Sequence, residues 1–530
     1  MKPNISQLSQ SARQAIAQRN GRVLHHSFTQ ILQIDPKNAE GHFLKGIFFK
    51  VQQKRADATS AFSTAFELDN GRYDAAVELA DLLAARQDYG AAKDLLKKSE
   101  EAMKNSPYYL NFAGEIYTRL GLHDAAWPLF KAANDIQKNA IPIETNLAAS
   151  AAKVGRYDVA QDYYSKLLSD TPEHQRHHFE MSRLSKAKDT QHIQAMEALL
   201  EQNGPPSALN IFLYFALGKE YEDLEDWDKA FHYLAMGNRF AAEQAAKSGY
   251  TSRADIDILE AIRDACDVDW LGEDEKPVPS DRSPIFIVGL PRTGTTLVER
   301  IISSHSQVET LGESFFLDEA IKRAAGGAFS RDVTQEIIHR AAKTPARDIL
   351  SDYLNTVSYR ALGSKYFIEK LPLNFLNIGF ILKAMPQAKI VVLDRKPMDA
   401  CFAMFKQPYF RFSYDLDGLA DYYIAFDQLR QHWQSIAGDR IVWIAYEDLV
   451  YDVDAQIQAL ITDIGLDFEP ACLDFHLSKT ASATASFAQI RQKAHTGSVN
   501  KWLKFKDHLQ PLAEKLEAAG IDVTAYKAPT

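Results

Sequence analysis

The sequence predicts two architectures in one chain: an all-α repeat solenoid, followed by an α/β domain built on a central parallel sheet. Small and large apolar residues recur at a spacing of 34 residues in the first half. In the second half, residues 285–288 form a short apolar run, typical of a strand buried on both faces of a parallel sheet. With 530 residues, the chain is long enough for two or more domains.

The composition is that of a soluble globular protein, with 46% hydrophobic and 25% charged residues. A net charge of −10 argues against nucleic acid as the main partner. Cys266, Cys401 and Cys472 form no CxxC motif and indicate a reducing compartment rather than a structural metal site. The first residues contain no apolar signal segment, and no apolar run has transmembrane length. We therefore expect a cytoplasmic protein without a membrane partner.

The 34-residue register is carried by pairs of positions. One position holds a small residue, at Gly46, Ala80, Gly114 and Ala148. Another holds a large residue, at Phe62, Leu96, Phe130 and Tyr164. This pattern resembles tetratricopeptide (TPR) repeats, in which small residues let paired helices approach and large ones fill the groove between them. We expect a TPR solenoid over residues 1–269, a connector over 270–283 and a second domain over 284–530.

A TPR solenoid presents a concave groove that often holds an extended peptide, and Tyr108, Tyr109 and Tyr117 are candidates to line it. Core packing explains these tyrosines equally well. Assembly, for example as a homodimer, is an equal alternative to peptide capture.

The apolar run at 285–288 leads into a loop with the spacing Gly289-x4-Gly294, followed by helical periodicity. This order predicts an anion cradle, because free backbone N–H groups converge at a helix N-terminus. The spacing fits the first half of a Walker A loop, but Thr295 stands where the phosphate-binding lysine belongs. Arg292 inside the loop offers a planar set of donors for oxyanions instead. The loop therefore favours a phosphate-bearing donor other than a magnesium nucleoside triphosphate.

The segment Pro291-Arg-Thr-Gly-Thr-Thr296 resembles the 5′-phosphosulfate-binding loop of sulfotransferases, above all of the tyrosylprotein sulfotransferase type. The resemblance extends over about residues 283–509. It implies a P-loop-like α/β fold and the donor 3′-phosphoadenosine 5′-phosphosulfate (PAPS), with 3′,5′-ADP as product and no metal. It assigns donor binding to the loop residues Arg292, Thr293, Gly294, Thr295 and Thr296.

Two further residues are expected to act on the reacting groups. Glu313 follows a short predicted strand at 308–311, and the resemblance makes it the base that accepts the acceptor's proton. Glu309 and Glu319 are weaker candidates, and a surface or capping role for Glu313 is the alternative. Lys370 ends the predicted strand at 366–370 and resembles the lysine of the family's strand-end Lys-x-Pro, which implies that it stabilises charge on the bridging oxygen of the donor. Its alternative is a solvated lysine at a strand end.

The 3′-phosphate motif of the family is an arginine followed eight residues later by a serine. Arg395 matches the arginine, whereas Ala403 replaces the serine and removes one hydroxyl donor, worth about 1 kcal/mol. Lys396 and Lys406 are the candidates to compensate. By the same resemblance Tyr446 flanks the adenine, Ser486 contacts the phosphosulfate and Lys501 binds on the nucleotide phosphate side.

These observations predict a PAPS-dependent sulfotransferase acting on an acceptor hydroxyl, including a protein tyrosine, with Glu313, Lys370, Arg292 and Ser486 as catalytic residues. Two other functions stay open. One is a kinase-like P-loop phosphotransferase, which the missing lysine disfavours. The other is a TPR interaction scaffold whose transferase half is vestigial. The identity of the acceptor does not follow from the sequence.

Overall fold

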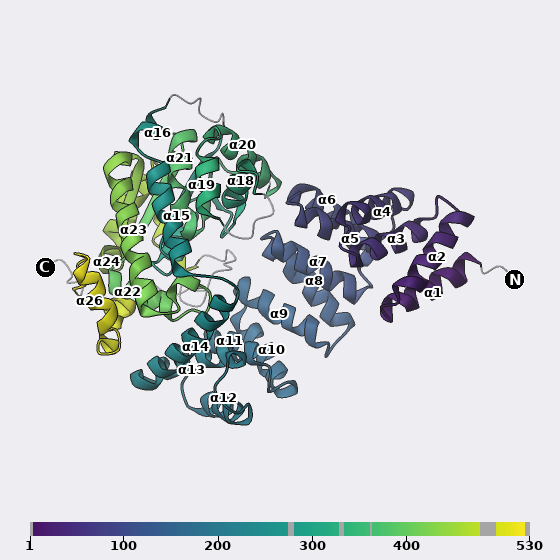
Figure 1. Ribbon diagram of the computed structural model, residues 1–530, viewed down its shortest axis with the longest axis horizontal. Coiled ribbons are helices and arrows are strands. Elements are labelled where there is room, and N and C mark those ends of the chain that lie inside the picture. Colours follow the sequence, from purple (N-terminus) through teal and green to yellow (C-terminus); the bar gives the residue numbers. More distant parts are fainter. Residues whose placement is uncertain (1–3, 274–279, 328–332, 361–362, 478–493, 525–530) are drawn as a thin grey trace. The chain divides into compact units, whose positions relative to one another are not determined.

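The structure is a computed structural model that describes residues 4–273, 280–327, 333–360, 363–477 and 494–524 (Figure 1). Contacts divide the chain into two compact units. Unit 1 comprises Met1–Ser150 with Ser358–Arg360, and unit 2 comprises Ala151–Val357 with Ala361–Thr530. Unit 2 thus includes helices that precede the sheet as well as the sheet itself. The expected boundaries at residues 269 and 284 stay predictions.

Unit 1 is a succession of helical hairpins in which α1 packs on α2, α3 on α4, α5 on α6 and α7 on α8 (Figure 1). The helices are α1 (Ile5–Ala17), α2 (Gly21–Ile34), α3 (Ala39–Val51), α4 (Arg55–Leu68), α5 (Tyr73–Ala85), α6 (Tyr89–Met103), α7 (Pro107–Arg119), α8 (His123–Ile136) and α9 (Ile141–Lys153). Unit 1 ends within α9.

The small and large positions of the repeat meet inside the hairpins. A Cβ atom on Gly46 would lie 2.5 Å from the ring of Phe62, and one on Gly114 would lie 2.7 Å from the ring of Phe130. Both rings are buried, so a larger residue in place of either glycine would force the paired helices apart. The predicted N-terminal helical repeats are confirmed.

The three tyrosines proposed for the groove differ in their surroundings. Tyr117 is buried and donates to Glu100, so it belongs to the core. Tyr108 is 63% exposed, and its ring meets that of Tyr109 edge-on at 4.9 Å. Core packing therefore explains Tyr117 but not Tyr108.

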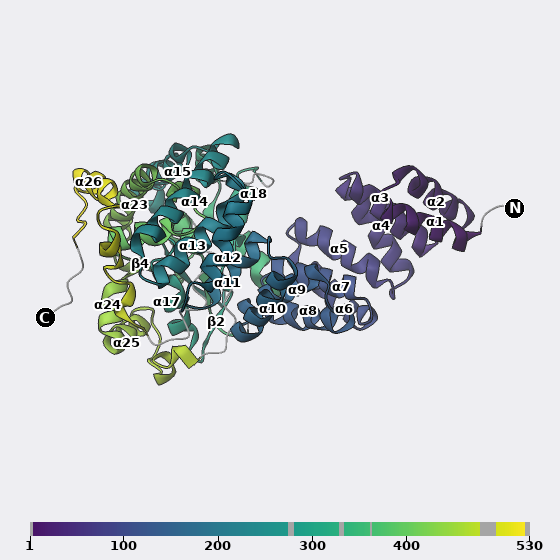
Figure 2. The same ribbon diagram turned by 90° about the horizontal axis from the view of Figure 1, so that it is seen from below.

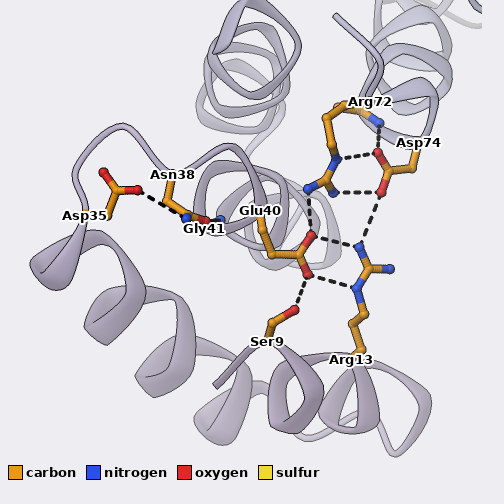
Figure 3. Close-up of polar contacts among 9 residues, drawn as sticks. Ser9, Arg13, Asp35, Asn38, Glu40, Gly41, Arg72 and Asp74 are labelled. Carbon is orange, nitrogen blue, oxygen red and sulfur yellow. Dashed lines mark hydrogen bonds and ion pairs between the residues drawn. The ribbon is translucent and has the colours of Figure 1, made fainter. Parts of the chain in front are cut away.

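An ion-pair network connects three successive hairpins of unit 1 (Figure 3). The Glu40 carboxylate accepts hydrogen bonds from Ser9 at 2.6 Å and from Arg13 at 2.8 Å. Arg72, just before α5, pairs with Glu40 and Asp74, both at 2.7 Å. Burial pushes the pKa of Glu40 upward, but the bonds from Arg13 and Ser9 outweigh it and the pKa falls below the ordinary value of 4.5.

Glu40→Gln is expected to reduce the free energy of unfolding of the full chain by about 2 kcal/mol at pH 7, because it leaves Arg13 and Arg72 without their shared partner. Since the folded pKa of Glu40 is lowered, this difference is complete above pH 4.5 and shrinks as the pH falls through the folded pKa. Denaturant unfolding at pH 7 and pH 3.5 measures it. Glu101→Gln, at an exposed pair with Lys104, is the control and should change little. Equal stability of Glu40→Gln and wild type at pH 7 would contradict the prediction.

Unit 2 begins with a second group of helices that precede the sheet. Among these, α13 and α14 pack closely along one another (Figures 1 and 2). The helices are α10 (Tyr157–Asp170), α11 (Gln175–Leu184), α12 (Gln191–Gln202), α13 (Ile211–Asp223), α14 (Trp227–Lys247), α15 (Ser252–Ala265) and α16 (Val268–Gly272). A Cβ atom on Gly218 would lie 2.6 Å from Leu234, so this hairpin uses the same close approach as those of unit 1.

A five-stranded, fully parallel sheet follows, as the sequence predicts, in the order β2-β3-β1-β4-β5. The strands are β1 (Ser283–Gly289), β2 (Val308–Thr310), β3 (Tyr366–Lys370), β4 (Lys389–Asp394) and β5 (Ile441–Ala445). The chain runs from β1 to one side for β2 and β3, then crosses to the other side for β4 and β5. The carboxyl end of β1 is therefore a topological switch point, where open α/β sheets bind ligands.

Helices cover both faces of this sheet. Ile285 and Ile287 pack on one face with apolar residues of α17 and α25, while Phe286 on the other face meets Tyr353 of α20 with ring centroids 5.9 Å apart. The remaining helices are α17 (Thr295–Ser303), α18 (Phe316–Ala324), α19 (Gln335–Ala341), α20 (Ala346–Val357), α21 (Ile378–Ala384), α22 (Pro397–Phe405), α23 (Leu416–Ala437), α24 (Tyr446–Tyr451), α25 (Val453–Asp463) and α26 (Gln510–Ala518). Among the described residues, none of the helices has both the length and the apolar character that a bilayer crossing needs.

Candidate active site

The carboxyl edge of the sheet gathers the residues that the sequence singled out. The loop 289–294 follows β1, Glu313 follows β2, Lys370 ends β3, Arg395 follows β4 and Tyr446 follows β5. Parallel strands direct their carboxyl ends to the same edge, so these residues converge although they are up to 154 positions apart, from Arg292 to Tyr446.

The backbone of the loop after β1 requires its two glycines. Gly289 has φ +143°, and a Cβ atom there would collide with the carbonyl oxygen of Leu393. Gly294 has φ +106°, and a Cβ atom would lie 2.5 Å from the ring of Tyr446. Gly294 is also the N-cap of α17 and makes no side-chain capping bond. The ring of Tyr446 thus lies against the glycine that begins α17, and a helix N-terminus at this place favours an anion.

Arg292 adopts the left-handed conformation with φ 68°, which is unusual for a residue with a side chain. Burial and the neighbouring Arg183 and Arg395 lower the pKa of Arg292 to about 10, while Glu313 acts in the opposite direction. Thr293 donates to the carbonyl oxygen of Leu290 at 2.7 Å and so closes the loop. Thr295 and Thr296 are buried in the first turn of α17. At neutral pH Arg292 stays charged among other cations, an arrangement that an anion would relieve.

Lys370 is completely buried and lies between two carboxylates. Its Nζ is 2.5 Å from Oε1 of Glu313 and 3.5 Å from Oε2 of Glu299. Lys370 is therefore not a solvated lysine. The Glu313 side chain is 35% exposed and thus reaches from Lys370 to solvent. It does not cap α18, whose N-cap is Phe315.

Glu299 was not foreseen from the sequence. It lies on α17 with its side chain 8% exposed and accepts a hydrogen bond from Thr310 at 2.7 Å. In the sequence, Glu299 and Arg300 together interrupt an apolar stretch of the helix, and no further signal singled out Glu299. Glu309, the weaker candidate for the base, instead accepts from the backbone N–H of Gly363 at 3.2 Å.

Arg395 joins three loops at the opposite side of the site. Its Nη1 donates to the carbonyl oxygen of Arg292 at 2.8 Å, and its Nη2 donates to that of Ser498 at 2.7 Å. Its Nε is buried and has no hydrogen-bond partner within the described part of the chain. The guanidinium lies 4.8 Å from the ring of Tyr446, whose hydroxyl is 2.7 Å from that of Ser498. Arg395, Tyr446 and the loop thus share one set of contacts.

The segment around Lys501 is held to α22 by a carboxylate that the sequence analysis missed. Asp399 accepts from the backbone N–H of Asn500 at 2.7 Å and from that of Trp502 at 3.3 Å. Lys501 between them pairs with Glu222 of α13 at 2.5 Å. Ser486, expected to contact the phosphosulfate, lies outside the described residues.

Five cations lie near one another beside the loop 289–294, and we name them the basic cluster: Arg183, Arg292, Arg395, Lys406 and Lys501. Lys406 also pairs with Glu222, at 2.8 Å. Burial lowers the pKa of Lys406. The positive charges of Lys501 and Arg292 lower this pKa further, whereas the carboxylate of Glu222 raises it. Ala403, one turn earlier on α22, has no hydroxyl to offer. Such a cluster suits a ligand with several negative charges.

Residues 284–470 match the sequence model of the sulfotransferase family. An uncharacterized protein of Aquifex aeolicus (strain VF5) is 26% identical over 441 residues, which cover 81% of this chain and 56% of that protein. The chain thus spans little more than half the length of this relative. A putative protein-tyrosine sulfotransferase of Caenorhabditis briggsae is 22% identical over 260 residues, covering 46% of this chain and 90% of the relative.

Among solved structures, the TPR protein YrrB, described as having an unusual peptide-binding site, aligns with 39% of this chain and 96% of its own. The TM-score is 0.29 and the identity 17%. The region that matches the sulfotransferase family model thus coincides with the parallel sheet of the C-terminal half, and helical hairpins precede it.

Proposed function

We propose that the sulfotransferase-family domain moves a sulfuryl group from PAPS to an acceptor hydroxyl, including that of a protein tyrosine, and releases 3′,5′-ADP. One observation carries the proposal. A fully buried lysine lies 2.5 Å from a partly exposed glutamate, at the switch point of the sheet and beside an anion-binding loop that lacks the Walker lysine.

The basic cluster supports this donor because PAPS carries charge at two ends, the phosphosulfate and the 3′-phosphate. Arg292 and the N-terminus of α17 suit the phosphosulfate. Arg395 and Lys501 suit the 3′-phosphate side, and Tyr446 offers its ring to the adenine. Lys406 supplies a charge close to the position where Ala403 replaces the expected serine.

In the proposed reaction, Glu313 accepts the proton of the acceptor hydroxyl while the acceptor oxygen forms a bond to sulfur. The bond between sulfur and the bridging oxygen breaks, and its electron pair stays on that oxygen as 3′,5′-ADP leaves. Lys370 stabilises the charge that grows there, more in the transition state than in the ground state. Since Lys370 and Glu313 are paired at 2.5 Å, the same lysine also orients the Glu313 carboxylate.

The acceptor is proposed to be a hydroxyl on a protein or peptide. Exposed aromatic side chains such as Tyr108 on the repeats are compatible with peptide capture. Assembly of the chain with itself is the alternative role of the repeats. Localisation in the cytoplasm stays a prediction.

Incubation with ³⁵S-labelled PAPS and fractionated cell extract tests the proposal. We expect label in a fraction that contains hydroxyl acceptors, in amounts equal to the 3′,5′-ADP formed. Transfer of ³²P from γ-labelled ATP, with no ³⁵S transfer, would favour a kinase-like phosphotransferase. Absence of both transfers, with no binding of 3′,5′-ADP, would favour a scaffold with a vestigial transferase half.

A further inference from the structure

A carboxylate from the helices that precede the sheet lies inside the basic cluster. Glu222, at the end of α13, has a side chain only 7% exposed. It pairs with Lys406 at the end of α22 at 2.8 Å and with Lys501 of the C-terminal segment at 2.5 Å. Both lysines come from the part of the chain that follows the sheet strand β4, so one carboxylate joins three elements far apart in the sequence.

Lys406 is held by its main chain as well. Asn238 of α14, the partner helix of α13, donates to the carbonyl oxygen of Phe405 at 2.8 Å in a buried position. The hairpin of α13 and α14 therefore contacts both the backbone before Lys406 and its ammonium group. A third contact between the helices before the sheet and the basic cluster comes from α11. Its Arg183 lies close enough to Arg292 to lower the pKa of Arg292.

The charges explain why a carboxylate is needed there. Two ammonium groups share Glu222, and Arg292 adds a further positive charge near Lys406. A buried ammonium without a counter-ion loses its proton or moves to water. Without Glu222, Lys406 would tend to lose its proton because it is mostly buried. Lys501, whose side chain is 36% exposed, would instead move away into solvent.

We infer that Glu222 is a positioning residue of the nucleotide site: it keeps Lys406 charged and Lys501 in place for the 3′-phosphate side of the donor. The helices before the sheet are then part of the transferase site rather than an attached module. The inference rests on the proposed function, since it takes the basic cluster as the binding site for PAPS and 3′,5′-ADP.

The test is calorimetric titration of the full-length chain with 3′,5′-ADP. Glu222→Gln keeps the shape and removes the charge, and we expect the Kd to rise about tenfold. The KM for PAPS should rise similarly, while kcat falls much less. Asp223→Asn is the matched control, because Asp223 is the next residue of the same helix but pairs with Lys219 and the backbone of Ala187. It should bind as wild type does.

A double-mutant cycle separates positioning from a general loss of structure. In a Lys406→Met/Lys501→Met background, Glu222→Gln should have no further effect on the Kd. If Glu222→Gln fails to fold, Glu222→Asp replaces it in the same cycle, with a smaller rise in Kd expected. An unchanged or lower Kd in a folded Glu222 variant overturns the inference while leaving the proposed function intact. Failure of the wild-type chain to bind 3′,5′-ADP overturns both.

Discussion

The Glu313→Gln variant is expected to transfer sulfuryl groups about 10³-fold more slowly than wild type at saturating PAPS. Glutamine matches glutamate in shape but accepts no proton, so the acceptor hydroxyl would have to lose its proton to water. Binding of 3′,5′-ADP should stay within about threefold of wild type, because the ion-pair partner of Glu313 is Lys370, which is not part of the basic cluster. Initial rates with ³⁵S-labelled PAPS and calorimetry with 3′,5′-ADP measure the two quantities separately.

Glu309→Gln is the control for this prediction. Glu309 lies on β2, four residues before Glu313, but its carboxylate accepts from Gly363 and Ser364. Its loss should leave kcat almost unchanged. Full turnover of Glu313→Gln, or an equal loss in both variants, would remove Glu313 from the role of base.

Lys370→Met is expected to lower kcat by about 10²–10³-fold, since it removes the positive charge nearest to the proposed base and leaving group. It also leaves the carboxylates of Glu299 and Glu313 facing each other without a counter-ion. We therefore expect a loss of about 3 kcal/mol in the free energy of unfolding as well. Rates must be measured well below the melting temperature, where the variant is fully folded.

Two comparisons distinguish catalysis from folding at this position. Glu299→Gln removes one of the two carboxylates that face Lys370 but keeps the lysine, so it should retain far more activity than Lys370→Met. Lys322→Met removes a lysine that pairs with Asp318 on α18, and it should keep full activity. A folded Lys370→Met variant with wild-type kcat would show that the lysine has only a structural role.

The strands and the loop could be predicted because their signals are local. The apolar run at 285–288 and the glycines around Arg292 require only neighbouring residues to be interpreted. Since parallel strands end at one edge, placing Glu313, Lys370 and Arg395 after strands was enough to bring them together. The repeat was equally accessible, because Gly46 and Phe62 recur in register with later repeats.

The contributions of Glu222, Asp399 and Arg183 could not be predicted in the same way. Each depends on how one element packs on another distant in the sequence, and a single buried carboxylate or arginine in an amphipathic helix leaves no periodic signal. Glu222 belongs to a helix whose pattern resembles the repeats, so the sequence favoured a role away from the transferase site. Ser486 stays a prediction from resemblance, because it lies outside the described residues.

Calorimetric titration with 3′,5′-ADP in the absence of magnesium, beside a titration with magnesium ATP, shows whether the loop after β1 binds the nucleotide of PAPS. We expect saturable binding of one 3′,5′-ADP per chain with a Kd of about 1–100 μM, and much weaker binding of magnesium ATP. If 3′,5′-ADP does not bind at millimolar concentration, or if magnesium ATP binds more tightly, the domain is not a PAPS-dependent sulfotransferase.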